Sequence, residues 1–383
     1  DNDLQPRSRE SLDVQTHASL ERNAGSINDF ANSIRAMRRH EIERIGLGWM
    51  SGVIDDKASL AGMTDVYDAA IDASLTWAIR HQTQEMGLDE APAAIAVIGM
   101  GRYGGREVNF SSDADVIIIY RPSDNADDNQ ANLFARKVQE DLRAILQGPT
   151  TLEPKIELDM DLRPEGKNGP LVRSYASCEE YYRSWASTWE HQALLRARYA
   201  AGDAALAEDF LMNVADPLRY PKIDLTEAQV AEIRKLKARM EAERLPRGVR
   251  RDRHLKLGKG GLSDVEWTIQ LLQLQHAGDN ANLRVNGTMQ ALDELERRKL
   301  VSAGDAVVLR RAWWMCTAAR NGSYLWSGRV NQADILPDDT YSLGGLAVYL
   351  GYDANRGQHF ENDLLAVMRK ARDVTERLFY GLS

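Results

Sequence analysis

Residues 99–120 read GMGRYGGREVNFSSDADVIIIY, and this stretch decides how the rest of the chain is interpreted. It overlaps the apolar run AIAVIGMG at 94–101 and ends in the β-branched run DADVIIIY at 113–120. Short apolar runs of this kind are typical of buried strands. The segment RYGGREVNF at 102–110 is too short for a full helical crossover but long enough for one or two helical turns. The sequence therefore predicts two strands joined by a short, glycine-rich connection.

The glycines of this stretch admit two interpretations. Gly99, Gly101 and Gly104 match the G-x-G-x-x-G pattern of dinucleotide-binding folds. Such a fold needs a substantial helix after the glycines and an acidic residue at the end of the next strand. Here the acidic pair precedes the second apolar run and little room is left for a helix, so a dinucleotide-dependent enzyme is a distant alternative. We favour Gly104 and Gly105 as a glycine pair that opens a short helix and exposes N–H groups to a triphosphate.

Two aspartates, Asp113 and Asp115, follow Ser112 at the start of the second predicted strand. Residues two apart on a strand point to the same face, so both carboxylates can converge on one point. Converging carboxylates repel each other unless a cation lies between them. Magnesium suits this position because it takes oxygen ligands and leaves sites open for phosphate oxygens. An Asp-x-Asp pair alone also occurs at exposed strand starts, and the preceding glycine pair is what favours a metal site.

A third group of acids lies in KIELDMDLRP at 155–164, where apolar and acidic residues alternate. This period of two predicts a strand whose polar face carries Glu157, Asp159 and Asp161. The turn-rich residues that follow predict that LVRSY at 171–175 returns as the partner strand of a hairpin. Three acids on one face are unfavourable without opposing positive charge, which a bound metal would supply. An exposed amphipathic strand is the alternative.

We therefore predict a site for two magnesium ions held by Asp113 and Asp115 together with the acidic face of residues 157–161, with one ion activating an attacking oxygen. Arginines suit phosphate binding because the planar guanidinium group contacts two oxygens at once. Arg163 ends the predicted acidic strand, and Arg196 and Arg198 close a predicted helix over 178–199. The predicted nucleotide-binding residues are Gly104, Gly105, Ser112, Arg163 and Arg196.

Composition sets bounds on the class of protein. The chain has 383 residues, 43% hydrophobic and 27% charged, which is typical of globular proteins and long enough for two domains. Its net charge of −9 argues against broad affinity for nucleic acid. No segment approaches the roughly 20 apolar residues of a membrane span, and the polar start lacks a signal core, so we expect a cytoplasmic protein without a membrane partner. Because it begins with Asp1, we expect a part of a longer polypeptide. Cys178 and Cys316 are expected to be ordinary thiols.

Helical periodicity dominates outside the predicted strands. Helices are expected within 10–88 and over 127–147, 178–199, 203–214, 226–244, 261–277, 285–298, 303–322 and 357–380. The two prolines of ADPLRYPKID at 215–224 indicate a domain boundary. We predict an α+β protein with an N-terminal helical segment (1–90), a catalytic domain with a small mixed sheet (91–218) and an all-helical domain (219–383).

Four ordered segments together resemble the glutamine synthetase adenylyltransferase family. They are GMGRYGGREVNFSSDADVIIIY (99–120), ELDMDLRPEGKNGPLVRS (157–174), YYRSWASTWEHQALLRAR (181–198) and LGKGGLSDVEWTIQLLQLQHA (257–277). The resemblance extends from about residue 30 to residue 380. It implies a polymerase-β-like nucleotidyltransferase core followed by a helical domain like that of PII-uridylyltransferase. Proteins of this family carry two homologous halves, and this chain has the length of one.

The resemblance also implies roles for individual residues. Asp113 and Asp115 match the metal-binding pair of the family, and Asp159 matches its third carboxylate. Asp161 stands where many members have arginine, and we assign it no role. The implied cofactor is Mg²⁺ with ATP as substrate, and the implied partners are glutamine synthetase, the PII signalling protein and glutamine as an effector. Gly260, Gly261 and the segment 264–266 form a recurrent motif in which Glu266 either approaches the site or packs and caps a helix.

The direction of the reaction depends on which half the chain resembles. One half of the family attaches AMP from ATP to a tyrosine of glutamine synthetase, and the other removes it by phosphorolysis, giving ADP. NFSSDAD at 109–115 resembles the removing half. DLRPEGKNGPLVRS, LLRAR, KLGKGGLSDVEW and ERLFYG resemble adenylylating C-terminal halves from high-GC Gram-positive bacteria. Most of the matched length therefore favours adenylylation. Removal of AMP is the alternative, and a catalytically inert PII-binding scaffold is a distant one.

Overall fold

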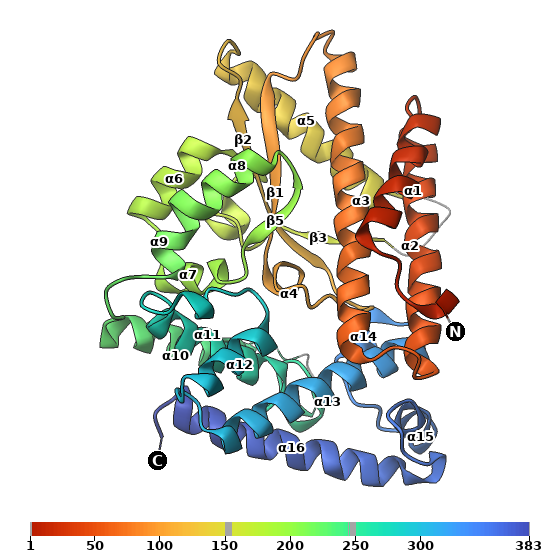
Figure 1. Ribbon diagram of the computed structural model, residues 1–383, viewed down its shortest axis with the longest axis vertical. Helices are drawn as coiled ribbons and strands as arrows, with labels where there is room; N and C mark the ends of the chain where they lie inside the picture. The colour runs from red at the N-terminus through yellow and green to blue at the C-terminus, as the bar shows by residue number, and fades with distance from the viewer. Residues whose placement is uncertain (1, 150–154, 244, 246–249, 383) are drawn as a thin grey trace. The chain divides into compact units, whose positions relative to one another are not determined.

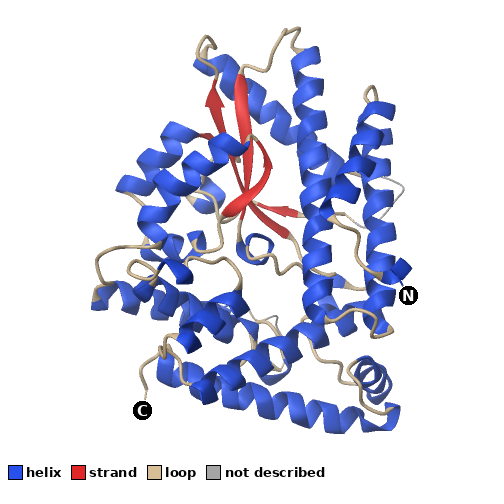
Figure 2. Cartoon of the chain, in the orientation of Figure 1, coloured by secondary structure: helices blue, strands red, loops and turns tan. Residues whose placement is uncertain are grey.

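The computed structural model describes residues 2–149, 155–243, 245 and 250–382. The chain divides into two compact units by its internal contacts. Unit 1 comprises residues 1–108 and 112–218, and unit 2 comprises residues 109–111 and 219–383. All named strands lie in unit 1, where they gather into one sheet surrounded by helices (Figure 2).

Unit 1 begins with three helices and then alternates strands and helices (Figure 1). The helices are α1 (Arg9–Arg22), α2 (Ile27–Met50), α3 (Asp56–Glu85), α4 (Gly101–Gly104), α5 (Asp128–Gln147), α6 (Tyr175–Ser184), α7 (Thr188–Leu194) and α8 (Ala204–Phe210). The strands are β1 (Ala93–Gly99), β2 (Ala114–Pro122), β3 (Leu158–Asp159), β4 (Val172–Ser174) and β5 (Arg198–Gly202). A π-helical turn (Leu211–Ala215) and α9 (Asp216–Arg219) follow. The predicted helices within 10–88 and at 127–147 are confirmed.

The sheet has the order β3-β2-β1-β5, with β4 also pairing with β2. β1 runs antiparallel to β2 and to β5, whereas β3 and β4 run parallel to β2. The two strands predicted from the apolar runs are confirmed as β1 and β2, in a register that sets Gly99 opposite Val116. The predicted α+β class with a small mixed sheet is also confirmed.

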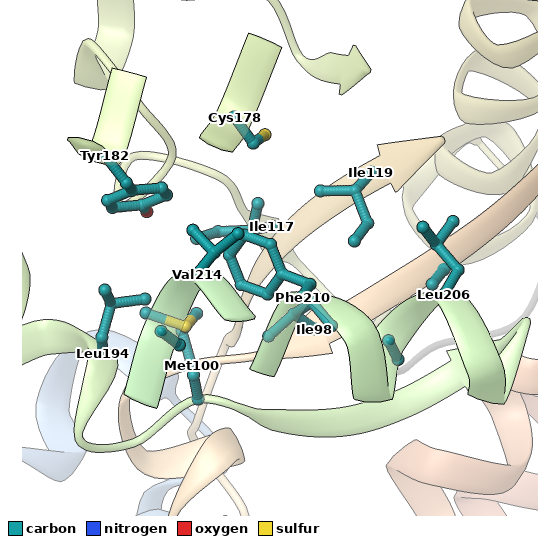
Figure 3. Close-up of a cluster of buried hydrophobic side chains, with 14 residues drawn as sticks. Ile98, Met100, Ile117, Ile119, Cys178, Tyr182, Leu194, Leu206, Phe210 and Val214 are labelled. Carbon is teal, nitrogen blue, oxygen red and sulfur yellow. The ribbon is translucent and has the colours of Figure 1, made fainter. Parts of the chain in front are cut away.

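One face of the sheet packs against α6 and α8 (Figure 3). Side chains alternate along a strand, so Ile98 and Met100 at the end of β1 share this face with Ile117 and Ile119 of β2. They are covered by Cys178, Tyr182, Leu206, Phe210 and Val214. Burial raises the pKa of the Cys178 thiol to about 12, and both cysteines are unpaired and buried, as the sequence predicts.

The predicted hairpin between residues 155–164 and 171–175 is wrong. β3 pairs with β2 at Ala114–Asp115 and β4 pairs with the same strand at Ile118–Tyr120, both in parallel. Two segments that run parallel to one strand must be joined by a returning loop, not by a tight turn. Asp161 lies in this loop, outside any strand, where its N–H donates to Oδ1 of Asp159 at 2.7 Å.

The predicted continuous helix over 178–199 is also wrong. The chain leaves α6 at Ser184 and starts α7 with a capping box, in which Glu190 accepts a hydrogen bond from the N–H of Ser187 at 2.8 Å. Arg198 does not close a helix but begins the edge strand β5, opposite Gly99 of β1. The structure therefore brings Arg198 to the end of the sheet where the predicted carboxylates lie.

The named elements in the described part of unit 2 are all helices. Its helices are α10 (Glu227–Glu243), α11 (Leu262–His276), α12 (Thr288–Arg297), α13 (Ala303–Ser327), α14 (Val330–Ala333), α15 (Thr340–Tyr349) and α16 (Gly357–Leu378). All five helices predicted beyond residue 225 are confirmed, while α14 and α15 were not predicted. Glu266 accepts a hydrogen bond from the indole of Trp313 at 3.3 Å, a packing contact within unit 2. No helix among the described residues is long and apolar enough to cross a membrane.

His254 fixes the turn that precedes α11. Its buried imidazole Nδ1 accepts the backbone N–H groups of Lys256 at 3.3 Å and Leu257 at 3.1 Å, so this nitrogen carries no proton. Burial lowers the pKa of His254, and the neighbouring cations Arg320 and Lys256 lower it further, against the opposing effect of Asp334. The folded protein therefore holds this imidazole neutral.

We expect acidification to destabilise unit 2 through His254. The unfolded histidine takes up a proton below a pH of about 6.5, whereas the folded one resists it, so the free energy of unfolding falls by up to about 1.4 kcal/mol per pH unit below that point. Urea unfolding at pH 7.5 and 5.5 (roughly one unit either side of the histidine pKa) measures this loss. His254→Asn, whose amide oxygen can accept the same N–H groups, should show a smaller pH dependence. Identical pH dependences of the two proteins would contradict the prediction.

Candidate active site

Two of the predicted carboxylates lie side by side at one end of the sheet. Asp115 of β2 and Asp159 of β3 are register partners on neighbouring parallel strands, which places their backbones about 4.8 Å apart. The N–H of Ala114 donates to the carbonyl of Glu157 at 2.8 Å, which fixes the register of β2 and β3. The N–H of Met100 donates to the carbonyl of Asp115 at 2.8 Å, which ties the glycine-rich stretch to β2. The fold thus joins the glycine-rich stretch to the distal acidic segment.

Asp113 directly precedes β2 and is exposed. It lines a cavity of about 440 Å³ together with Asp159 and residues of the loop that follows β3. Asp161 is half exposed on the same cavity and forms an ion pair with Lys167 at 3.2 Å. The structure therefore brings Asp113, Asp115 and Asp159 to the same end of the sheet, with a charged, open cavity beside them.

The chemistry of this donor set suits magnesium, which takes carboxylate oxygens in preference to other ligands. Asp159 Oδ1 accepts the N–H of Asp161 and is thereby held toward its own loop. Within the described part of the chain, no three acidic, histidine or cysteine side chains are already gathered around one point. Binding of one ion by all three aspartates therefore requires their side chains to move.

Gly101, not the Gly104–Gly105 pair, makes the close approach to the carboxylates. Gly101 has a φ of +51°, and a Cβ atom at this position would lie 2.0 Å from Oδ2 of Asp115. The N–H groups of Gly104 and Gly105 donate to the carbonyls of Met100 and Gly101 within the single turn of α4. The prediction that this pair exposes its N–H groups to a triphosphate is therefore wrong. Gly104 is required for packing, because its Cβ would lie 2.0 Å from the carbonyl oxygen of Arg196.

The guanidinium groups of the two predicted phosphate-binding arginines are already engaged by other groups of the protein. Arg163 is buried and donates to three backbone carbonyls within residues 160–169, at 2.7 to 3.1 Å, so it holds the loop together. Arg196 is also buried and forms an ion pair at 3.3 Å with Glu107, whose side chain is buried as well. Sequence spacing cannot reveal this, because a guanidinium group serves carbonyls and phosphates equally well. The cations that line the cavity with a larger exposed surface are Arg143 of α5 and Lys167.

Helix α3 supports the predicted site through residues that sequence patterns did not single out. The hydroxyl of Tyr67 donates to the carbonyl of Ser112 at 2.7 Å, immediately before Asp113, and accepts from Arg38 at 2.8 Å. Arg198 donates to the buried carboxylate of the adjacent Asp68 at 2.7 Å. In the sequence these residues belong to an ordinary helical pattern, and only the tertiary contact gives them their role. Ser112 itself lies beside the aspartates, anchored through its carbonyl.

Gly101→Ala is expected to reduce catalytic activity strongly. The added methyl group would displace the carboxylate of Asp115, and the left-handed φ adds strain of roughly 1–2 kcal/mol. We expect at least about a hundredfold loss of turnover, equivalent to about 3 kcal/mol, without loss of folded structure by circular dichroism. Gly52→Ala is the matched control, because Gly52 also has a positive φ but its added Cβ would meet no atom within 4 Å. Equal activities of the two variants would contradict the assignment.

Comparison with known proteins agrees with the motifs. The family model for glutamate-ammonia ligase adenylyltransferase matches residues 2–213, which include the whole sheet and all three aspartates. The chain belongs to this family. The model for GlnD PII-uridylyltransferase matches residues 231–379, within unit 2. The family resemblance predicted from the four motifs is thereby confirmed.

Individual members of the family match almost the whole chain. The bifunctional glutamine synthetase adenylyltransferase/adenylyl-removing enzyme of Bifidobacterium longum (strain DJO10A) is 79% identical over 381 residues, which is 100% of this chain and 35% of that protein. The enzyme of the same name from Mycobacterium avium (strain 104) is 42% identical over 347 residues, covering 90% of this chain and 34% of that protein. The enzyme of the same name from Streptomyces avermitilis is 40% identical over 387 residues, covering 99% of this chain and 38% of that protein. The chain spans about a third of the length of these family members.

Proposed function

We propose that this chain transfers AMP from ATP to a tyrosine of glutamine synthetase, through a polymerase-β-like nucleotidyltransferase core around Asp113, Asp115 and Asp159. The observation that best supports this proposal is that Asp115 and Asp159 are register partners on adjacent strands. Gly101 lies against Asp115, and it has no side chain that would displace the carboxylate. Three aspartates at one end of the sheet, beside an open, charged cavity, suit a metal-bound substrate that carries several phosphates. The family membership supplies the substrate class.

The proposed chemistry is an in-line displacement at the α-phosphorus of ATP. The tyrosine hydroxyl oxygen bonds to phosphorus, the bond to the bridging oxygen breaks, and pyrophosphate leaves. Asp113, Asp115 and Asp159 would hold Mg²⁺, which when bound neutralises phosphate charge and favours loss of the phenolic proton. Lys167 and Arg143 add positive charge at the cavity that Asp113 lines. In this proposal Asp159 also helps to draw off the phenolic proton.

The proposed partners follow from the family. Glutamine synthetase is the protein substrate, named in the relatives as the target of their adenylyltransferase activity. The match of residues 231–379 to a PII-uridylyltransferase model supports a role for unit 2 in binding the PII signalling protein. Glutamine is the effector that the family resemblance implies. These assignments place the chain in the control of nitrogen assimilation.

The reverse chemistry, phosphorolysis of tyrosine-linked AMP to ADP, is the second candidate. It is favoured by the residues just before the aspartate pair, Asn109 to Ser112, which resemble the removing half of the family. Here Oδ1 of Asn109 accepts the N–H of Ser111 at 3.2 Å. Both activities appear in the name of each relative. Adenylylation is our choice because the other motifs, which cover most of the matched length, resemble that half.

Labelled AMP transfer tests the direction. ATP labelled in its α-phosphate is incubated with unmodified glutamine synthetase and Mg²⁺, and incorporation into protein is measured. The mirror assay gives the enzyme labelled, adenylylated glutamine synthetase and orthophosphate, and measures ADP release. Label incorporated only in the first assay supports adenylylation. Release of ADP alone would overturn it in favour of phosphorolysis, and activity in neither assay would support an inert scaffold.

A further inference from the structure

Unit 2 contains a cavity of about 790 Å³ that the proposed chemistry does not use. One wall is the C-terminal part of α16, where two rows spaced by four and three residues, 365-369-372 and 366-370-373, face the cavity. The other wall comes from the turns that precede α11. The lining residues are Arg250, Arg251, Asp252, Lys259, Leu365, Ala366, Met368, Arg369, Lys370, Arg372 and Asp373.

The charge of this cavity is opposite to that of the whole chain. Six of its lining residues are basic and two are acidic, although the chain carries a net charge of −9. Arg250 is paired with Asp252 at 2.6 Å, and Arg372 is paired with Asp264 at 3.1 Å. Four of the cations that line the cavity are exposed and have side chains with no ion pair or hydrogen bond in the described part of the chain: Arg251, Lys259, Arg369 and Lys370. Asp252 and Asp373, which line the same cavity, offset only part of this charge, and solvent or a bound anion must offset the rest.

The glycine motif found in the sequence builds this cavity. Gly260 has a φ of +73°, and a Cβ atom there would lie 1.7 Å from the carbonyl oxygen of Met368, so the turn presses directly on α16. Asp264 accepts the N–H of Gly260 at 2.7 Å and Arg372 at 3.1 Å, which ties the same turn to α16 a second time. Lys259, next to Gly260, is thereby held against the basic rows of the helix. Buried, specific contacts thus position exposed cations whose side chains form no ion pair or hydrogen bond within the described residues.

We propose that this cavity binds the polyphosphate group of a small molecule, with a nucleoside triphosphate or an inorganic polyphosphate as its source. Its volume lies within the roughly 300–1,000 Å³ of small-molecule sites, which favours a compact ligand over a flat protein surface. Several cations converging without partners suit a ligand with three or four negative charges. Leu365, Ala366 and Met368 offer apolar surface for the body of a nucleotide. The site lies within unit 2 and uses none of the aspartates proposed for AMP transfer.

Binding is tested on the full chain carrying Asp115→Asn, with EDTA present, so that magnesium-dependent binding at the proposed active site does not contribute. Calorimetry measures the Kd for ATP and for inorganic triphosphate. The variants are Lys259→Gln and the double change Arg369→Gln/Lys370→Gln. Arg311→Gln is the matched control, because Arg311 is an exposed cation of unit 2 outside this cavity. Circular dichroism confirms that each variant is folded.

We expect the Kd to rise at least about tenfold in each cavity variant, to stay unchanged in the control, and to rise with salt. Binding of both probes would identify the polyphosphate chain itself as the recognised group. Binding of ATP alone would identify a nucleotide held partly by the apolar wall. Equal affinities in all variants, or no binding of either probe, would overturn the proposal. Displacement of ATP by a single-stranded oligonucleotide at far lower concentration would also overturn it, in favour of a nucleic-acid surface.

Discussion

Replacing Asp115 by asparagine is expected to reduce AMP transfer by about a thousandfold or more, equivalent to about 4 kcal/mol of transition-state stabilisation. Asp115 lies beside Asp159 in the register of β2 and β3, and its carboxylate contacts the backbone of Gly101. Asparagine has the same shape but no negative charge, so it should fit this position while weakening the binding of a divalent cation. The loss should therefore appear in kcat with little change in stability. Labelled AMP transfer over a range of Mg²⁺ concentrations measures it.

The matched control is Asp161→Asn. Asp161 lines the same cavity as Asp159 and lies two residues further along, but it is half exposed and already paired with Lys167. Removal of its charge should change activity by less than about threefold, since exposed ion pairs contribute only about 0–1 kcal/mol. Full activity of Asp115→Asn, or equal losses in the two variants, would refute a magnesium site at Asp115. Thermal unfolding of both variants separates loss of charge from loss of fold.

The parts of the fold that were predictable are those that local sequence determines. β1 and β2 are continuous apolar runs, and the helices of unit 2 show apolar residues at helical spacing, so each carries its own signal. The alternating residues 155–164 predict a strand, but only Leu158 and Asp159 form one, as β3, and alternation alone does not determine which strand it pairs with. Its parallel pairing with β2 is decided by contacts between segments far apart in the sequence. The pairing of β5 with β1 is also decided by distant contacts, whereas the local sequence predicts the end of a helix at Arg198.

For the candidate site, too, the local sequence predicts some residues and not others. The spacing of Asp113 and Asp115 and the acid at 159 indicated which carboxylates come together, because strand geometry fixes which residues share an end. The partners of the arginines were not predictable, because Arg163 and Arg196 find carbonyls and a carboxylate that only the folded loops supply. The role of Gly101 was likewise hidden, since its neighbour Asp115 comes from the next strand.

Asp264→Asn is expected to destabilise unit 2 by about 2–3 kcal/mol, because it removes the buried carboxylate shared by Lys237 and Arg372. Among the described residues, Lys237 then keeps only Glu241, at 2.6 Å, as its partner. The carboxylate of Asp264 is 1% exposed and pairs with Nζ of Lys237, itself 2% exposed, at 2.6 Å. Burial alone would raise the pKa of Asp264, but Lys237 and Arg372 outweigh burial and lower the pKa. The carboxylate of Asp264 therefore stays charged in mild acid. Its contribution to the free energy of unfolding is complete above a pH of about 4, the ordinary pKa of aspartate. This contribution is lost only as the pH falls through the lowered pKa of Asp264 in the folded protein.

Asp293→Asn serves as the control for Asp264→Asn, because Asp293 pairs with Arg310 at 2.7 Å while its side chain is 54% exposed. Solvent screens this pair, so its removal should cost no more than about 1 kcal/mol. Urea unfolding gives the two free energies, and hydrogen exchange localises the loss. Asp264 ties α10, through Lys237, to α11 and to Arg372 of α16, so exchange should accelerate in those three helices together and leave the sheet of unit 1 unchanged. Equal destabilisation by the two substitutions would show that the buried network does not hold the helices together. Uniform acceleration in both units would show that they unfold as one, and that the loss is not confined to this network.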